Sequence, residues 1–482
     1  MRKTVLLLIA RQLWRQAFRN KGIFILTVII GLLLAYAAFT GWKNVARQNA
    51  IRQQFQEEAR HDWVNNPDKH PHRMAHYGHF AFRPQSSLSF FDFGMESYMG
   101  STIFLEAHKQ NSVNFSEASF STGLLRFGEI SMAMILQVLV PLLIVFLGFS
   151  SIAAERENGT LKILLSQGIS WQELIAGKGL GIISIVLVLY LPVLLVSVLL
   201  WMSFIQFRVS AHELISIGCI AGAYFGYFVV YSLIAVLVSA TSKTAKAALV
   251  KLIGIWLLFT IVLPRATQSL GAYGYPAPST IAFQAAIEKD ILKEGDSHNP
   301  DDAHYKAIKD SLLKVHQVDS VEKLPFNYSG FIITEGEKIS ATIYNRHLAQ
   351  LLQRYDQQNS IARYAAFVNP FMAIKYFSMA VTGTDYNSYI RFQDQAERYR
   401  YYMAQRMNEL QIKYIPNKKP GPADRPYTIS SQHWEELLEF HYEPASLGTV
   451  IGHERICIAA FIAWFLLLLI ITRVLSQQLK AI

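Results

Sequence analysis

Cysteine and charge are both scarce in this sequence. Only two of its 482 residues are cysteines, Cys219 and Cys457, and only 17% of the residues are charged. Both cysteines lie in apolar runs, so the two long polar segments of the chain contain none and can form no disulfide. Together with 52% hydrophobic residues, the low charge indicates a membrane protein rather than a soluble one.

Complete motifs for nucleotide hydrolysis or zinc proteolysis are also missing. The Gly-Lys-Gly at 177–179 lacks the glycine-rich loop and the following Ser or Thr that cradle phosphates. The strings HELIS at His212 and HERIC at His453 begin like a zinc-protease helix, but neither has the second histidine four residues on. The sequence therefore predicts no catalytic residues and no cofactor bound by this chain.

Six apolar runs have the length of membrane spans. Each has about 16 to 24 residues, close to what a helix needs to cross about 30 Å of hydrocarbon. The run 180–202 lacks the polar stripe that a buried helix of a soluble protein usually keeps. The sequence therefore predicts an α-helical integral membrane protein with six transmembrane helices. The six runs are 22–38, 132–152, 180–202, 214–237, 247–263 and 456–471.

The distribution of charge gives the expected orientation. The net charge is +10, but the two long polar segments, 43–130 and 265–454, together carry −2 and the rest of the chain carries +12. This excess lies in the termini and short loops on one side of a six-span arrangement, which the positive-inside rule makes the cytoplasmic side. We therefore expect both termini in the cytoplasm and both long segments outside. Because topology explains the basic charge, we expect no nucleic-acid partner.

The polar parts of the chain have patterns of their own. Arg11, Arg15 and Arg19 recur every four residues opposite an apolar face, which predicts an N-terminal amphipathic helix on the inner membrane surface. For 43–130 we expect a small extracytoplasmic domain of mixed or mostly helical structure. For 265–454, which is long enough for its own core, we expect a second, mostly helical extracytoplasmic domain. Helical patterning recurs there near 281–294, 302–315, 340–366, 386–412 and 432–440.

The connection between the second and third spans is unusually polar and well punctuated. The residues Thr160–Ser166 predict a short helix across the membrane surface, and Gly168 suits a helix stop. Ser170, followed three residues later by Glu173, predicts a capping box that begins the next helix. By itself this pattern fits an ordinary capped connection as well as a rigid helix presented to a soluble partner.

The string ERENGTLKILLSQGISWQELIAGKGLG resembles the signature of ABC-2 type transporter permeases, whose coupling helix docks on the ATPase subunit. Gly168 and Trp171 depart from the Pro and Arg common in that pattern. The strings AHYGHFAFRP, EAHKQN, NPFMAIKYFSMAVTGTD and AERYRYYMAQRMNEL resemble a subgroup with two large extracytoplasmic insertions. The positions that match the loop signature, and that the resemblance assigns to ATPase coupling, are Glu155, Arg156, Glu157, Gly159, Thr160, Leu161, Gly177 and Lys178.

This resemblance implies the permease subunit of an exporter in the bacterial inner membrane. Its partners would be cytoplasmic ABC ATPase subunits, which bind ATP and Mg, a second permease that is identical or related, and membrane lipid. The nearly neutral outer segments favour docking to an envelope protein over capture of a charged polymer. The expected division is an amphipathic helix at 1–21, spans at 22–42, 131–153, 179–264 (three) and 455–473, outer domains at 43–130 and 265–454, a coupling loop at 154–178 and a tail at 474–482.

A different hypothesis fits the same sequence. The chain can be an envelope-facing membrane scaffold or sensor without transport activity, whose outer domains bind another protein. Such an anchor would have no need of a structured cytoplasmic loop. Recovery of the protein from native membranes with or without an ATP-binding subunit discriminates between the two hypotheses.

Two smaller groups of residues stand out. Glycine recurs every four residues in the fourth span, a pattern that lets another helix approach closely, although glycine is also frequent in membrane helices generally. Histidines crowd into part of the first outer segment, where imidazoles can bind zinc or copper. Because no cysteine or acidic framework accompanies them, we favour hydrogen bonding within the fold and predict no metal site. The residues are Gly218, Gly222 and Gly226, and the weak metal candidates His70, His72, His76 and His79.

Overall fold

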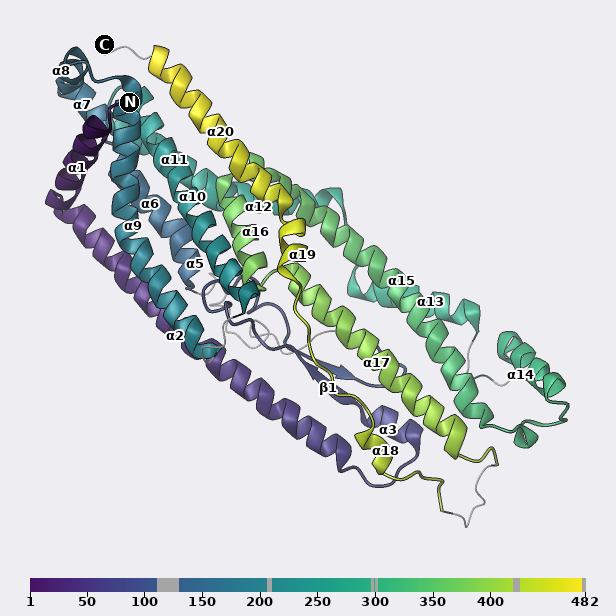
Figure 1. Ribbon diagram of the computed structural model, residues 1–482. Helices are drawn as coiled ribbons and strands as arrows, with labels where there is room; N and C mark the ends of the chain where they lie inside the picture. Colours follow the sequence, from purple (N-terminus) through teal and green to yellow (C-terminus); the bar gives the residue numbers. More distant parts are fainter. Residues whose placement is uncertain (111–129, 206–209, 296–298, 300–301, 419–424, 479–482) are drawn as a thin grey trace.

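The computed structural model describes residues 1–110, 130–205, 210–295, 299, 302–418 and 425–478. Residues 111–129 of the first expected outer domain and 479–482 of the expected tail therefore lie outside the described residues. The molecule is elongated and mostly helical (Figure 1). The N-terminus and the last described residue, Gln478, lie at one end, beside α7 (Ala153–Glu157) and α8 (Thr160–Ser166), while α3 (Pro71–Tyr77) and α18 (Gln432–Glu435) lie toward the other.

Among the described residues, six helices are long and apolar enough to cross a membrane, which agrees with the prediction of a multi-pass helical membrane protein. Two of the six contain a π-helical stretch, and one of these two also has turn residues at 149–152, so each is made up of several labelled elements. The six are α2 (Lys21–Val64); α5 (Met132–Met134), η2 (Ile135–Leu139), α6 (Val140–Gly148) and α7; α9 (Trp171–Phe204); α10 (Ala211–Thr241); α11 (Ala245–Leu257), η3 (Leu258–Val262) and α12 (Leu263–Gly274); and α20 (Arg455–Gln478).

The first of these helices is much longer than the span predicted at 22–42. α2 has 44 residues, or about 66 Å at 1.5 Å per residue, roughly twice the thickness of the hydrocarbon layer. Its second half is polar but contains no proline and no helix-stopping residue before Asn65. The first outer segment therefore begins as a continuation of the first spanning helix and not as a separate unit.

The remaining elements are mostly helices of the second long polar segment. β1 (His79–Phe82) and β2 (Thr102–Leu105) pair antiparallel, with His79 opposite Leu105 and Phe82 opposite Thr102. Three of the five helical stretches predicted in 265–454 match α13, α14 and α17. α15 begins at Tyr328 instead of residue 340, and α18 is shorter than predicted. The helices are α1 (Lys3–Arg19), α13 (Thr280–Glu294), α14 (Ala303–Val315), η4 (Val321–Lys323), α15 (Tyr328–Tyr364), η5 (Ala365–Phe367), α16 (Pro370–Thr382), α17 (Tyr386–Tyr414) and α19 (Leu447–His453).

The two long polar segments share one hydrophobic core, here called the outer core after the side of the membrane that the sequence predicts for them. Trp63 of α2, Met74 of α3 and Ile103 of β2 are buried together with Met403 of α17 and Trp434 of α18. The sequence predicted two outer domains, at 43–130 and 265–454, and residues of both ranges pack into this one cluster. The reason is that α3 and the short hairpin cannot bury their apolar faces alone and use α17 as their second layer.

α16 is a helix that the sequence pattern did not reveal, and it packs among the apolar helices. It is only 13 residues long, too short to span a bilayer, and nearly all of its side chains are buried. Phe371 and Ile374 belong to the same hydrophobic core as the six long apolar helices, and α16 contacts α10 and α20. The segment 265–454 therefore returns to the bundle before it leaves again as α17.

Candidate functional site

The polar connection between the second and third apolar helices folds into two short helices. α7 continues the second long helix, and Gly159, with φ of +74°, turns the chain into α8. Gly168, with φ of +79°, follows α8. Both glycines adopt left-handed conformations that residues with a Cβ rarely take, so each fixes a sharp change of direction. The predicted short helix is confirmed with the same bounds.

A buried ion pair fastens α7 to α9. Lys178 is only 1% exposed, and its Nζ lies 2.5 Å from Oε1 of Glu155, which is itself 12% exposed. A lysine ammonium at such a position is tolerated only when a carboxylate compensates for its lost hydration. Glu155 and Lys178 were both assigned to coupling, and the structure places them together, inside the protein rather than on its surface.

Arg156 and Ser239 connect α7 to α10 and to Ser242, the residue that follows α10. The guanidinium of Arg156 donates to the carbonyl oxygens of Ala240 and Ser242, at 2.7 and 2.5 Å. Ser239 Oγ accepts the backbone N–H groups of Ile152 and Ala153, both at 3.0 Å. The start of α7 therefore has partners for its first N–H groups, and the helix cannot move without α9 and α10.

Glu157 and Thr160 lie at the surface but are also held. Oε2 of Glu157 accepts the N–H of Ala245, the first residue of α11, at 3.1 Å. A carboxylate at a helix N-terminus is favoured by the helix dipole. Thr160 Oγ1 donates to the carbonyl of Glu155 at 3.1 Å, which closes the turn between α7 and α8. Leu161, by contrast, is completely buried and anchors α8 on the bundle.

The capping box predicted at the start of α9 is present, and a distant residue completes it. Ser170 Oγ accepts the N–H of Glu173 at 3.2 Å, and Glu173 Oε2 accepts the N–H of Ser170 at 3.1 Å. The same carboxylate also accepts the N–H and the guanidinium of Arg2, with distances of 2.8 to 3.0 Å. Arg2 further donates to the carbonyl of Gly168 at 2.6 Å. The loop is thus tied to the beginning of α1.

α1 packs along α9 through its apolar face, which confirms that it is amphipathic. Ile9 and Leu13 are buried, while the arginines of the opposite face are exposed. Gly177 and Gly181 of α9 allow the close approach, since a Cβ on Gly177 would lie 2.8 Å from the Cβ of Ile9. Gly177, which the resemblance assigned to coupling, is therefore a packing residue between α1 and α9.

The surface that remains open to a partner is the outward side of α8, here called the α8 face. Ile163 is the large aliphatic side chain of α8 with the greatest exposure, at 56%. Residues around it on this face and the preceding turn are also exposed. They are Glu157, Asn158, Gly159, Thr160, Lys162, Ser166 and Gln167.

The three glycines of the fourth span do not mediate close packing within the chain as a group. A Cβ added to Gly218 or Gly222 would meet no described atom within 4 Å, and both residues are exposed. A Cβ added to Gly226, by contrast, would lie 3.4 Å from the ring of Phe465 in α20. Close helix approach at Gly218 and Gly222 therefore has no partner among the described residues.

The four histidines proposed as weak metal candidates separate into two groups. Nδ1 of His70 accepts the N–H of His72 and so caps α3. His79 is buried beside Trp63, and burial lowers its pKa from 6.5 to about 4. These contacts give His70 and His79 positions within the fold, away from the rings of the other two histidines. His72 and His76 instead approach His108, which the sequence reasoning did not single out.

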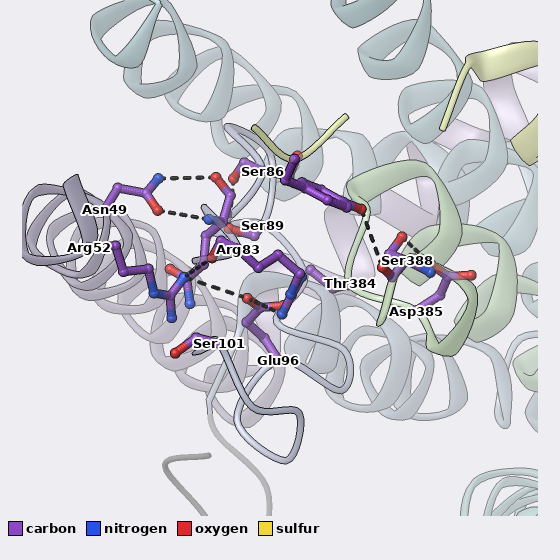
Figure 2. Close-up of polar contacts among 12 residues, drawn as sticks. Asn49, Arg52, Arg83, Ser86, Ser89, Glu96, Ser101, Thr384, Asp385 and Ser388 are labelled. Atoms are coloured by element: carbon purple, nitrogen blue, oxygen red, sulfur yellow. Dashed lines mark hydrogen bonds and ion pairs between the residues drawn. The ribbon is translucent and has the colours of Figure 1, made fainter. Parts of the chain in front are cut away.

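A buried polar cluster ties the outer loop after β1 to α2 (Figure 2). Nη2 of Arg83 donates to Oε1 of Glu96 at 2.8 Å, and Arg52 lies 4.0 Å from the same oxygen. Asn49 donates to the carbonyl of Gln85 at 3.0 Å and accepts its N–H at 2.8 Å. The outer part of α2 is therefore fixed to the loop and moves with it.

Two neighbouring cavities lie where the outer segments meet the apolar bundle. One, of about 630 Å³, is lined by residues of α15, α17 and α19, among them Glu397, and by Asp385, which caps α17. The other, of about 550 Å³, is lined by Arg83, by Glu213 of α10 and by Val381 of α16. Both have polar and apolar walls, so an amphiphilic molecule is the kind of ligand whose surface would match them.

A comparison with known families gives a match in the second long polar segment. Residues 280–443 match the model of a family described as a domain of unknown function, DUF3526. The matched region runs from α13 to the segment that follows α18, so it includes neither α7 nor α8. No curated protein matches the chain.

Proposed function

We propose that the chain is the permease subunit of an ABC-2 type transporter and that the α8 face is the docking surface for a cytoplasmic ATPase subunit. The observation that carries the proposal is the combination of an exposed apolar side chain, Ile163, with a rigid support beneath it. A passive loop has no need of a buried Glu155–Lys178 pair. A surface that receives force must not yield when a partner presses on it.

The support for α8 also suggests how movement would spread. A displacement of α8 reaches α9 through the Glu155–Lys178 pair and reaches α10 and α11 through Arg156 and Glu157. It reaches α1 through the contact between Glu173 and Arg2. ATP and Mg would bind to the ATPase subunit, whose closure would rock these helices together. A second permease, identical or related, would complete the assembly, with the open Gly218–Gly222 side of α10 available for contact.

The outer segments are then extracytoplasmic and handle the cargo or a partner. α2 runs without interruption from the end that holds α1 to the outer core, so rocking of the bundle moves the outer core as well. The two cavities with mixed walls suit an amphiphilic cargo. Export rather than import, and the bacterial inner membrane as location, rest on the family resemblance of the loop.

Co-purification from native membranes tests the docking surface. Ile163→Asp places a charge on the α8 face without touching its buried supports, and Ile163→Leu keeps the apolar contact. A buried interface residue of this kind can cost more than 2 kcal/mol of binding when it is lost. We expect wild type and Ile163→Leu to recover an ATP-binding subunit and Ile163→Asp to lose it. Recovery without any ATP-binding subunit, in wild type as well, would favour the envelope scaffold or sensor.

A further inference from the structure

Three histidine side chains meet in the outer part of the molecule. His72 and His76 are four residues apart on α3 and therefore lie on the same side of that helix. His108, from the turn after β2, faces both. The ring centroids of His72 and His76 are 4.7 Å apart, and that of His108 is 5.3 Å from each. One potential ligand nitrogen from each ring lies within 4.8 Å of the other two.

The backbone holds the turn that carries His108 against α3. The N–H of Ala107 donates to the carbonyl of Ala75 at 3.1 Å, and Glu106 and Lys109 form an antiparallel bridge across the turn. His108 itself has φ of +64°, a left-handed conformation that is unfavourable for a residue with a Cβ. Strain of this kind persists where the surroundings determine the conformation, and it gathers at functional sites.

A buried carboxylate orients the imidazole of His108. Oε2 of Glu337, on α15, lies 3.0 Å from Nδ1 of His108. Its other oxygen lies 2.5 Å from Nη1 of Arg400, and both of these side chains are fully buried. In the tautomer whose Nδ1–H donates a hydrogen bond to Glu337, Nε2 of His108 carries the free electron pair that can bind a metal ion. A carboxylate behind a histidine is the usual second layer of a metal site.

We propose that His72, His76 and His108 bind one divalent transition-metal ion of the class that prefers imidazole, represented by Zn(II) and Cu(II). Four-coordinate zinc with metal–nitrogen distances of about 2.0 to 2.1 Å separates its ligand nitrogens by about 3.4 Å. The rings need to approach by little more than an ångström, and His76 and His108 are exposed enough to move. Water from the exposed side would supply a remaining ligand.

A bound ion would join α3, the turn after β2 and, through Glu337, α15. The inference goes beyond the proposed function because it concerns the outer core alone.

The test uses the full chain in detergent without a polyhistidine tag, titrated separately with Zn(II) and Cu(II). His76→Gln removes an exposed ligand, and His108→Asn removes another while keeping a residue that tolerates positive φ. His61→Gln is the matched control, since His61 is an exposed histidine on α2. We expect one ion per chain in wild type and His61→Gln, with nitrogen coupling in the Cu(II) electron paramagnetic resonance spectrum.

Loss of a ligand should weaken binding by more than the about 10- to 100-fold that loss of an outer-layer partner costs. Thermal unfolding should therefore shift upward with Zn(II) in wild type and His61→Gln and stay unchanged in His76→Gln and His108→Asn. Comparable unfolding temperatures of all four proteins without metal would show that the substitutions leave the fold intact. Equal metal affinity in wild type and His76→Gln, or no stoichiometric binding to wild type, would overturn the proposal.

Discussion

At the scale of single residues, the motif positions of the loop have two different roles. Leu161 and Lys178 are buried, and the side chains of Glu155 and Arg156 are occupied by partners within the chain. The exposed side chain best suited to a partner is Ile163, which the resemblance did not assign. The sequence indicates that the loop is structured, but burial depends on contacts with α1, α9 and α10 that no local pattern encodes.

The Glu155–Lys178 pair gives the first prediction. Glu155→Gln leaves the ammonium of Lys178 buried without a compensating charge, which should destabilise the protein by about 3 kcal/mol. The double variant Glu155→Gln/Lys178→Met removes both charges and should recover most of this loss, because a buried pair replaced by uncharged groups is often nearly neutral. Chemical unfolding in detergent measures both. A single variant as stable as wild type would show that the pair contributes nothing.

His79 predicts a dependence of stability on pH in the outer core. Burial, followed by the charge of Arg60, lowers its pKa to about 4, below the 6.5 of the unfolded chain. The unfolded state therefore binds the proton first, so this stability is fully present above pH 6.5 and is lost as the pH falls toward 4. The loss should reach about 3 kcal/mol. Hydrogen exchange of β1 in His79→Phe, compared with wild type, should show a weaker pH dependence; identical profiles would assign the effect to other groups.

At the scale of elements, the contact between α1 and α9 depends on glycine. Gly177→Leu would drive a side chain into Ile9, and overpacking of this kind costs typically about 1 to 3 kcal/mol. We expect α1 to detach and its arginines to become faster sites of tryptic cleavage. Gly218→Leu is the control of equal bulk, since its surroundings within the chain are open. Unchanged cleavage in Gly177→Leu would contradict the packing described.

Sequence patterns predicted those helices whose position depends on residues close together in the sequence. Apolar run length gave the six long helices, and Ser170 with Glu173 gave the start of α9. The patterns did not show that Glu173 also holds Arg2, which is 171 residues away, so its carboxylate does more than cap a helix. They also missed α16. Nearly all of its residues are buried, so its sequence lacks the alternation of polar and apolar faces that indicates a helix.

At the scale of the whole molecule, two outer segments that look separate in sequence share one core. Trp63 and Trp434 illustrate this, since the indole N–H of Trp63 donates to the carbonyl of Trp434 at 3.1 Å across 371 residues. The same folding brings His108 to His72 and His76. Neither contact can be predicted from composition or periodicity. The first depends on how α18 returns to α2, and the second on how the turn after β2 returns to α3.

The central claim is that the α8 face docks on an ATP-binding protein, and site-directed crosslinking tests it most directly. The native cysteines are favourable for this, because Cys457 is buried and Cys219 is only partly exposed in α10. Ile163→Cys, labelled with a photo-crosslinker in native membranes, should attach to a cytoplasmic ATP-binding protein, while the exposed Leu438→Cys of the outer segment should not. Crosslinks from Ile163→Cys to lipid alone, or to no ATP-binding protein, would contradict the account.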